Sequence, residues 1–273
     1  MPWPFDREYM QLALAAGVIV GASAPLIGTF LVQRRMSLMG DGIGHVAFAG
    51  VAAGLLLRTE PVSTALVLAV IASIVMERLR ARAQATGDVA LALFFYSGIA
   101  GGVVLLGLAD SFNAGVFSYL FGSVLFVDRG ELVTIAVLGA VVLSTIAFTR
   151  RALFGLVMDE EWAGVAGVPA GALNLMLAAL TAVTIVAAMR IVGLLLVAAL
   201  MVLPVASAQL LSKSFRGTMR WSVVIGIGSV VVGLTAARVW ALAPGGTIVL
   251  ACAAFFAVVA LVRRGATSVV HAG

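Results

Sequence analysis

Charged residues are scarce in this chain. Asp, Glu, Lys and Arg make up 11% of the 273 residues, whereas hydrophobic residues make up 63% and the mean hydropathy is +1.18. Soluble domains carry about 25% charged residues, so the composition excludes a soluble globular protein. It predicts an all-α, polytopic membrane protein, and residues 1–273 are expected to form a single transmembrane domain.

The motifs of several enzyme classes are also missing. The single lysine, Lys213, does not follow a glycine-rich loop, so the chain lacks the Gly-x-x-x-x-Gly-Lys-Ser/Thr motif that cradles nucleotide phosphates. Neither His-Glu-x-x-His nor Gly-x-Ser-x-Gly occurs. The single cysteine, Cys252, excludes an internal disulfide and a cysteine-rich metal site. We therefore expect no catalytic residues and no enzyme activity in this chain.

Nine apolar segments are long enough to be membrane spans. The total is eight if the two shortest early segments form one irregular hairpin. Abundant glycine, at 30 residues, suits helices that approach each other closely. The nine segments run roughly over residues 9–31, 42–57, 62–76, 89–109, 132–149, 172–189, 192–211, 221–240 and 247–262.

The 17 basic residues predict the orientation of these spans. They lie in short clusters between apolar runs, so the net charge of +5 reflects topology and not nucleic-acid binding. With nine spans and an outer N-terminus, every second loop is basic, as the positive-inside rule requires. The cytoplasmic side then holds Arg34, Arg35, Arg78, Arg80, Arg82, Arg150, Arg151, Lys213, Arg216, Arg220, Arg263 and Arg264. The outer side holds Arg7, Arg58, Arg129, Arg190 and Arg238.

Two segments do not fit plain spans. Residues 114–127 are apolar but too short to cross twice, and they predict a short outer helix or a re-entrant segment. Residues 155–174 follow a basic pair and lie in the cytoplasm. Within them, residues near 155–170 predict a short helix with acids in its first turn and Gly167 near its end. This helix is either a docking element or a surface helix without a partner, and composition alone favours the second.

Asp41 and His45 are ionisable residues near the start of the second apolar segment. A charged side chain at bilayer depth costs about 2.5–3.5 kcal/mol on insertion scales, so its presence predicts function. The i, i+4 spacing places both side chains on one helix face, where they offer an oxygen and a nitrogen ligand to a divalent metal. The alternative is a structural pair, in which Asp41 caps a helix that begins near Gly42 and His45 binds a carbonyl.

Glycines surround this pair at the spacing of close-packed membrane helices. Gly40 and Gly44, then Gly50 and Gly54, are each separated by three residues. Such small-x-x-x-small patterns let another helix approach the same face. We expect ordinary helix packing here, which would also fix the geometry of the two polar side chains.

The segment from Arg34 to His45 resembles the RRMS-x-x-GD-x-x-x-H signature of metal ABC transporter permeases, the zinc, manganese and iron uptake group. Four more segments resemble motifs of this family in the same order. They are the YLFG segment at residues 119–123, the cytoplasmic coupling segment at 159–168, the VGxLLVxALLVxPAA helix at 192–206 and the PxGxxIVL turn at 243–250. The resemblance covers nearly the whole chain.

The resemblance implies a fold and a set of partners. The family's permeases are homodimers with the translocation path at the dimer centre, and their fold resembles that of vitamin B12 importer-type ABC permeases. ATP-binding cassette subunits dock on the cytoplasmic coupling helices, and an extracytoplasmic metal-binding protein delivers the ion. The chain would be the permease subunit of an ATP-driven importer of divalent metal ions in the bacterial inner membrane. Zinc is the first candidate and manganese the second, with no tightly bound cofactor.

The same resemblance assigns residues. Asp41 and His45 match the family's metal-path residues, and two copies of each in a dimer, or water, would complete a shell of about four to six ligands. Ala241 stands where many relatives carry an aspartate, which removes a possible extra ligand. Two alternatives remain, a permease for a metal-chelate or siderophore-type substrate and a non-transporting scaffold. The coupling residues by this resemblance are Asp159, Glu160, Glu161, Trp162 and Gly167.

Overall fold

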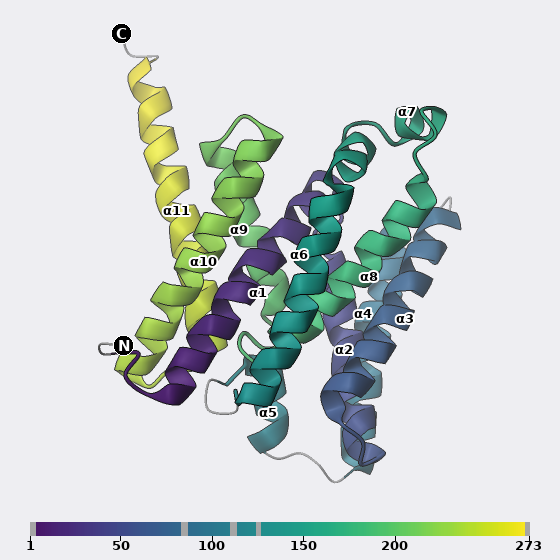
Figure 1. The fold of residues 1–273 in the computed structure, drawn as a ribbon, viewed down its shortest axis with the longest axis vertical. Coiled ribbons are helices and arrows are strands. Elements are labelled where there is room, and N and C mark those ends of the chain that lie inside the picture. The colour runs from purple at the N-terminus through teal and green to yellow at the C-terminus, as the bar shows by residue number, and fades with distance from the viewer. Residues whose placement is uncertain (1–3, 83–86, 110–113, 124–126, 271–273) are drawn as a thin grey trace.

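A computed structural model describes residues 4–82, 87–109, 114–123 and 127–270, and every regular element in these ranges is a helix (Figure 1). The helices are α1 (Glu8–Gln33), α2 (Met39–Leu56), α3 (Pro61–Arg82), α4 (Gly87–Leu108), α5 (Ala114–Phe121), α6 (Arg129–Met158), α7 (Glu160–Val165), α8 (Ala170–Ala188), α9 (Val197–Leu211), α10 (Phe215–Trp240) and α11 (Pro244–Val270).

Eight of these helices are long and apolar enough to span a membrane, namely α1, α2, α3, α4, α6, α8, α10 and α11. The ninth apolar helix, α9, is shorter. The start of α1 and the end of α11 lie at opposite ends of the bundle (Figure 1), so the described helices cross it an odd number of times. The prediction of an all-α membrane protein with eight or nine spans is therefore confirmed.

The predicted span over residues 192–211 is helical only from Val197 onward. A 15-residue helix is about 22 Å long, too short for a hydrocarbon core of about 30 Å. Residues 189–196 supply the remainder as irregular backbone, which survives at membrane depth only where protein satisfies its polar groups. The N–H groups of Leu194 and Leu195 donate to the carbonyls of Tyr119 and Leu120, at 2.9 and 3.2 Å.

The helix that supplies these carbonyls, α5, lies in the segment expected to be a short outer helix or a re-entrant piece. It is eight residues long and packs against α11 and α2. Residues 124–126 of the predicted segment lie outside the described residues. Two glycines permit the contact, because Gly122 and Gly193 have φ of +76° and +89° and each approaches the other segment's backbone too closely for a Cβ.

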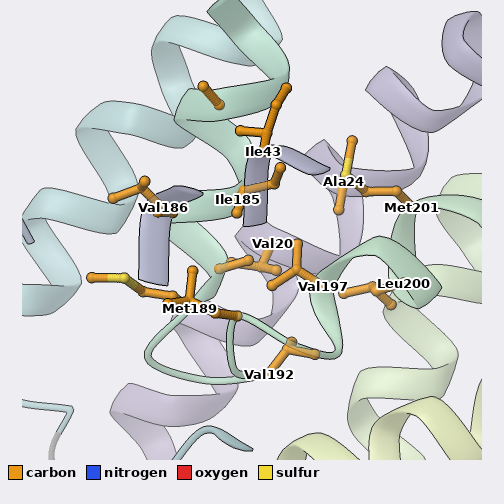
Figure 2. Packing of buried hydrophobic residues seen from close by; sticks show 14 of the residues in the cluster. Val20, Ala24, Ile43, Ile185, Val186, Met189, Val192, Val197, Leu200 and Met201 are labelled. Atoms are coloured by element: carbon orange, nitrogen blue, oxygen red, sulfur yellow. The ribbon is translucent and has the colours of Figure 1, made fainter. Parts of the chain in front are cut away.

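The core lies where α1, α2, α8 and α9 meet (Figure 2). Its side chains are aliphatic, and Val20, Ile43, Ile185 and Leu200 are all fully buried. Close approach is achieved with glycine, since a Cβ on Gly28 of α1 would overlap the carbonyl of Met201 in α9. The span of α1 is 67% buried, whereas that of α4 is 17% buried, so α1 is a central helix and α4 a peripheral one.

One end of the bundle collects the basic loops. The α1–α2 and α9–α10 turns, α7 and the C-terminal end of α11 all lie at the upper end in Figure 1, and the start of α1 and α5 lie at the lower end. Arg34, Arg35 and Lys213 belong to those upper turns. By the positive-inside rule the upper end is cytoplasmic, and the lower end is the outer side.

Candidate functional site

Asp41 and His45 lie in the first two turns of α2, close to the cytoplasmic end. The helix begins at Met39, earlier than the predicted Gly42, and its N-cap is Leu38, which makes no side-chain cap bond. The interpretation of Asp41 as a helix cap is therefore wrong, because Asp41 is already the third helical residue. A carboxylate there still gains from the positive end of the helix dipole.

Neither side chain has a protein partner within the part of the chain that the structure describes. Both residues are half-buried. The Nδ1 atom of His45 is buried without a hydrogen bond, so the proposed bond to a neighbouring carbonyl is absent from the described residues. Asp41 likewise forms no ion pair or hydrogen bond with any described residue. Two potential metal ligands on one helix face therefore have no hydrogen-bond or ion-pair partner among the described residues.

Three buried or half-buried ionisable residues at the edges of the bundle behave differently, because they form ion pairs. Glu77 is buried and binds Arg80 at 2.7 Å. Arg34, whose side chain is 7% exposed, binds Glu160 at 2.7 Å, and Arg190 pairs with Glu131. Pairing is the usual way to offset the desolvation of a charge, and Asp41 and His45 lack it although both are half-buried.

The helices around α2 hold this pair in place. The His45 ring meets the edge of Phe95 from α4, with ring centroids 4.3 Å apart. On the other side, a Cβ added to Gly44 would lie 3.2 Å from the carbonyl of Leu194, in the irregular segment before α9. The predicted close helix packing is present here, since added Cβ atoms on Gly50 and Gly54 would lie 2.6 and 2.8 Å from the Cα atoms of α3.

Gly98 of α4 provides a test of this packing. A Cβ at Gly98 would lie 2.6 Å from the backbone carbon of His45, so Gly98→Ala must push α4 away from α2. We expect it to lower the melting temperature of the purified protein, with a loss of about 1–3 kcal/mol typical of overpacking. Gly107→Ala, in the same helix but with nothing within 4 Å, is the matched control. Equal melting temperatures for the two variants would contradict the close contact.

The predicted cytoplasmic helix is present as α7. The side chain of Asp159 caps it by accepting a hydrogen bond from the Trp162 N–H at 2.9 Å. Glu160 and Glu161 occupy its first turn, as expected, and Gly167 follows its end with φ of +81°. The Trp162 side chain is 67% exposed. The arrangement therefore presents an aromatic side chain to the cytoplasm.

A polar network that the sequence did not predict joins α7 to the loop before α2. The Arg34 guanidinium donates to Glu160 at 2.7 Å and also to the Asn174 side chain, and the Asn174 amide donates to Glu160 at 2.8 Å. In the sequence, the only indication of this network was Asn174, an isolated asparagine in the apolar run that forms α8. The network links α7 to Arg34, at the C-terminal end of α1, and to Asn174 of α8.

A second unpredicted cluster lies at the outer end. Arg190 pairs with Glu131 and stacks over the Tyr119 ring at 4.3 Å, beside a cavity of about 420 Å³ that Glu60 also lines. Burial raises the pKa of Glu60, but hydrogen bonds from Ser63 and the charge of Arg190 outweigh it, so the net pKa lies below the usual value. Arg190 thus anchors the irregular segment to α5 and α6.

Ala241, the position where an acid was expected, is the left-handed C-cap of α10 at its outer end, with φ of +52°. Asp41 lies in the first turn of α2, which follows the α1–α2 turn at the opposite, cytoplasmic end (Figure 1). An acid at 241 would therefore not complete the shell of Asp41 and His45 within one chain. No group of three or more His, Cys, Asp or Glu side chains forms a metal site among the described residues.

A bundle of apolar spans with an exposed helix at its cytoplasmic end is consistent with a membrane transport protein. The chain belongs to the ABC 3 transport family, whose family model matches residues 6–263. The predicted family and its multi-pass location in a bacterial inner membrane are therefore confirmed, and the chain is a transport subunit without a catalytic role of its own.

Characterised relatives align along nearly the whole chain. The high-affinity zinc uptake system membrane protein ZnuB of Haemophilus influenzae is 30% identical, over 94% of this chain and 98% of the relative. The manganese import system permease protein ScaB of Streptococcus parasanguinis is 33% identical, over 91% of this chain and 89% of the relative. These names indicate two different metals for permeases of similar sequence.

Solved structures confirm the fold. PsaBC from Streptococcus pneumoniae, in complex with Fab, matches with a TM-score of 0.84 at 30% identity, over 93% of this chain and 91% of that chain. An inward-facing transporter described as metal-chelate type matches with a TM-score of 0.69 at 15% identity, over 92% of this chain and 85% of that chain, which supports the fold alone. The prediction of an ABC permease fold is confirmed.

Proposed function

We propose that this chain is the permease subunit of an ATP-driven importer of divalent metal ions, with zinc as the first candidate and manganese as the second. The observation that carries the proposal is the pair of polar side chains on α2 without hydrogen-bond or ion-pair partners among the described residues. Asp41 and His45 share one helix face, and neither has a partner among the described residues. An imidazole and a carboxylate suit both metals, and relatives named for zinc and for manganese support the class of substrate.

The metal path is proposed to lie between two copies of the chain. Asp41 and His45 are only half-buried in a single copy, although they sit near the start of a membrane span. A second copy related by two-fold symmetry would cover them and supply two aspartates and two histidines around one axis. Water would complete the shell. Such a site holds the ion weakly enough to release it, as transport requires.

The energy for transport is proposed to come from an ATP-binding cassette subunit that docks at α7. Trp162 is 67% exposed and Val165 is 89% exposed, so the helix carries apolar contact surface on its cytoplasmic side. Asp159, Glu160, Glu161, Trp162 and Gly167 would form or shape the docking element. On the outer side, an extracytoplasmic metal-binding protein would deliver the ion.

The polar network offers a route from docking to the ion. Movement of α7 displaces Glu160, which holds the buried Arg34 of the α1–α2 loop. That loop leads into Met39, the first residue of the helix that carries Asp41. ATP binding and hydrolysis on the partner would therefore shift α2 against α4 and α9 and switch access of the ion from the outer side to the cytoplasm.

Metal content of cells tests the function. In cells that lack this chain and grow in metal-limited medium, zinc, manganese and iron are measured together by mass spectrometry, with and without the chain restored from a plasmid. We expect zinc to fall first, or manganese if that is the substrate, and to recover on complementation. Unchanged zinc and manganese would contradict the proposal, and a selective loss of uptake from an added ferric chelate would favour the chelate importer.

A further inference from the structure

A basic cavity lies at the cytoplasmic end of the bundle, far from the Asp41 and His45 pair. It has a volume of about 580 Å³ and is bounded by the C-terminal part of α6 and the first turns of α10. Its walls include Arg150, Arg151, Arg216 and Arg220, together with Phe154 and Phe215. The proposed transport function makes no use of it.

The four arginines carry no counter-charge within the described residues. All four are exposed, and no described acid forms an ion pair with any of them, whereas Arg34, Arg80, Arg129 and Arg190 each have a carboxylate partner. The positive-inside rule explains why arginines lie on this side. It does not explain why four of them from two helices line one cavity, where a bound anion would lower their mutual repulsion.

The backbone adds to the positive potential. The Ser214 hydroxyl caps α10 by accepting from the Gly217 N–H at 3.1 Å. The N–H groups of Phe215 and Arg216, at the first two helical positions, have no acceptor within the helix, and both residues line the cavity. With the helix dipole, these donors favour a phosphate group.

The surroundings of the cavity are apolar and belong to lipid-facing surface. Phe154 and Phe215 pack edge to face at 5.1 Å in its wall. Further toward the membrane centre, Phe148 on α6 is 88% exposed and Val224 on α10 is 58% exposed. A ligand with a phosphate group and long acyl chains would contact both the charged cavity and the apolar surface beside it, whereas a soluble anion would contact only the charged cavity.

We propose that this cavity binds the headgroup of an anionic phospholipid from the inner leaflet. This headgroup carries one or two phosphates. The arginines contact the phosphate oxygens, and the acyl chains lie along the exposed apolar side chains of α6 and α10. Basic pockets between membrane helices on the cytoplasmic side are suited to such headgroups. Bound lipid ties α6, which leads into α7, to α10.

Lipid titration of the full-length protein tests the proposal. The delipidated protein in detergent is titrated with cardiolipin, phosphatidylglycerol or phosphatidylcholine, and binding is followed by native mass spectrometry and by the melting temperature. The variants are R216Q/R220Q and R150Q/R151Q. The control, R35Q/R78Q, removes the same charge from exposed arginines on the same side but outside the cavity. Inorganic pyrophosphate serves as the soluble anion.

We expect the wild type to bind cardiolipin or phosphatidylglycerol in preference to phosphatidylcholine. Each cavity double variant should lose about 25-fold in affinity, since each basic residue near the surface contributes about fivefold, and the control should bind as the wild type does. Equal losses in cavity and control variants would overturn the proposal. Pyrophosphate binding as tight as lipid binding would also overturn it. So would cavity variants that still bind lipid but no longer bind the ATP-binding subunit, because the cavity would then be a protein docking surface.

Discussion

Replacing Asp41 with asparagine is expected to reduce zinc and manganese uptake to below about 1% of the wild-type rate. A charge-assisted contact contributes about 1.5–3 kcal/mol, and both copies in a dimer would lose it. His45→Ala should act similarly, because the only ring nitrogen donor on this face is lost. Uptake is measured with radioactive zinc and manganese in cells that express equal amounts of each variant.

The stability of the same variants separates a transport role from a structural one. Asp41 has no protein partner among the described residues, so Asp41→Leu should raise the melting temperature or leave it unchanged while it abolishes uptake. A buried polar group without a partner costs about 1–3 kcal/mol. Asp6→Asn, an exposed acid at the outer N-terminus, is the control. Normal metal accumulation with Asp41→Asn would contradict the metal-path proposal. A sharp fall in melting temperature would indicate a structural role.

The second large effect is expected at the ion pair between α7 and the α1–α2 loop. Glu160→Ala leaves the Arg34 guanidinium, 7% exposed, without its carboxylate. Loss of one partner of a buried pair costs about 3–5 kcal/mol, and because Glu160 is half exposed we expect about 1–3 kcal/mol here. In proteoliposomes with the ATP-binding subunit, the variant should still support ATP hydrolysis while uptake per ATP falls at least about tenfold.

A charge swap and a matched control test whether the pair itself matters. The double variant Arg34→Glu, Glu160→Arg should recover part of the uptake that each single variant loses, because the attraction is restored in reverse. Glu8→Ala breaks another ion pair of 2.7 Å, with Arg129, but that pair is exposed on the outer side. It should leave coupling unchanged. If Glu8→Ala and Glu160→Ala behave alike, the Arg34–Glu160 pair does not transmit the movement of α7.

Much of the fold was predictable because its signals are local. Each long span is a run of apolar residues bounded by charge or glycine, and helix caps such as Asp159 and Ser214 are encoded within four residues of the bond they make. The face shared by Asp41 and His45 also follows from helical periodicity alone. The start of α2 was misplaced by three residues, because Leu38, which has no capping side chain, precedes it.

What could not be predicted depends on contacts between distant segments. The span over residues 192–211 reads as one apolar helix, yet residues 189–196 are irregular, with the N–H groups of Leu194 and Leu195 donating to carbonyls of α5 and the Ser123 N–H donating to the Arg190 carbonyl. The pairing of Arg34 with Glu160 joins residues 126 positions apart, and no local pattern records it. The same holds for the arginines that line the cytoplasmic cavity from α6 and α10.

The sequence by itself determined three features: that the chain is a helical membrane protein, which end faces the cytoplasm, and which two polar residues share a helix face. It did so because hydrophobic length, basic loops and an i, i+4 spacing are properties of short stretches. The tertiary structure alone decided which charges are neutralised. Burial drives Arg34 and Arg190 to partners on other segments, whereas the Asp41 and His45 side chains have none among the described residues. That difference in pairing, and not the presence of charge, distinguishes the proposed metal ligands from structural ion pairs.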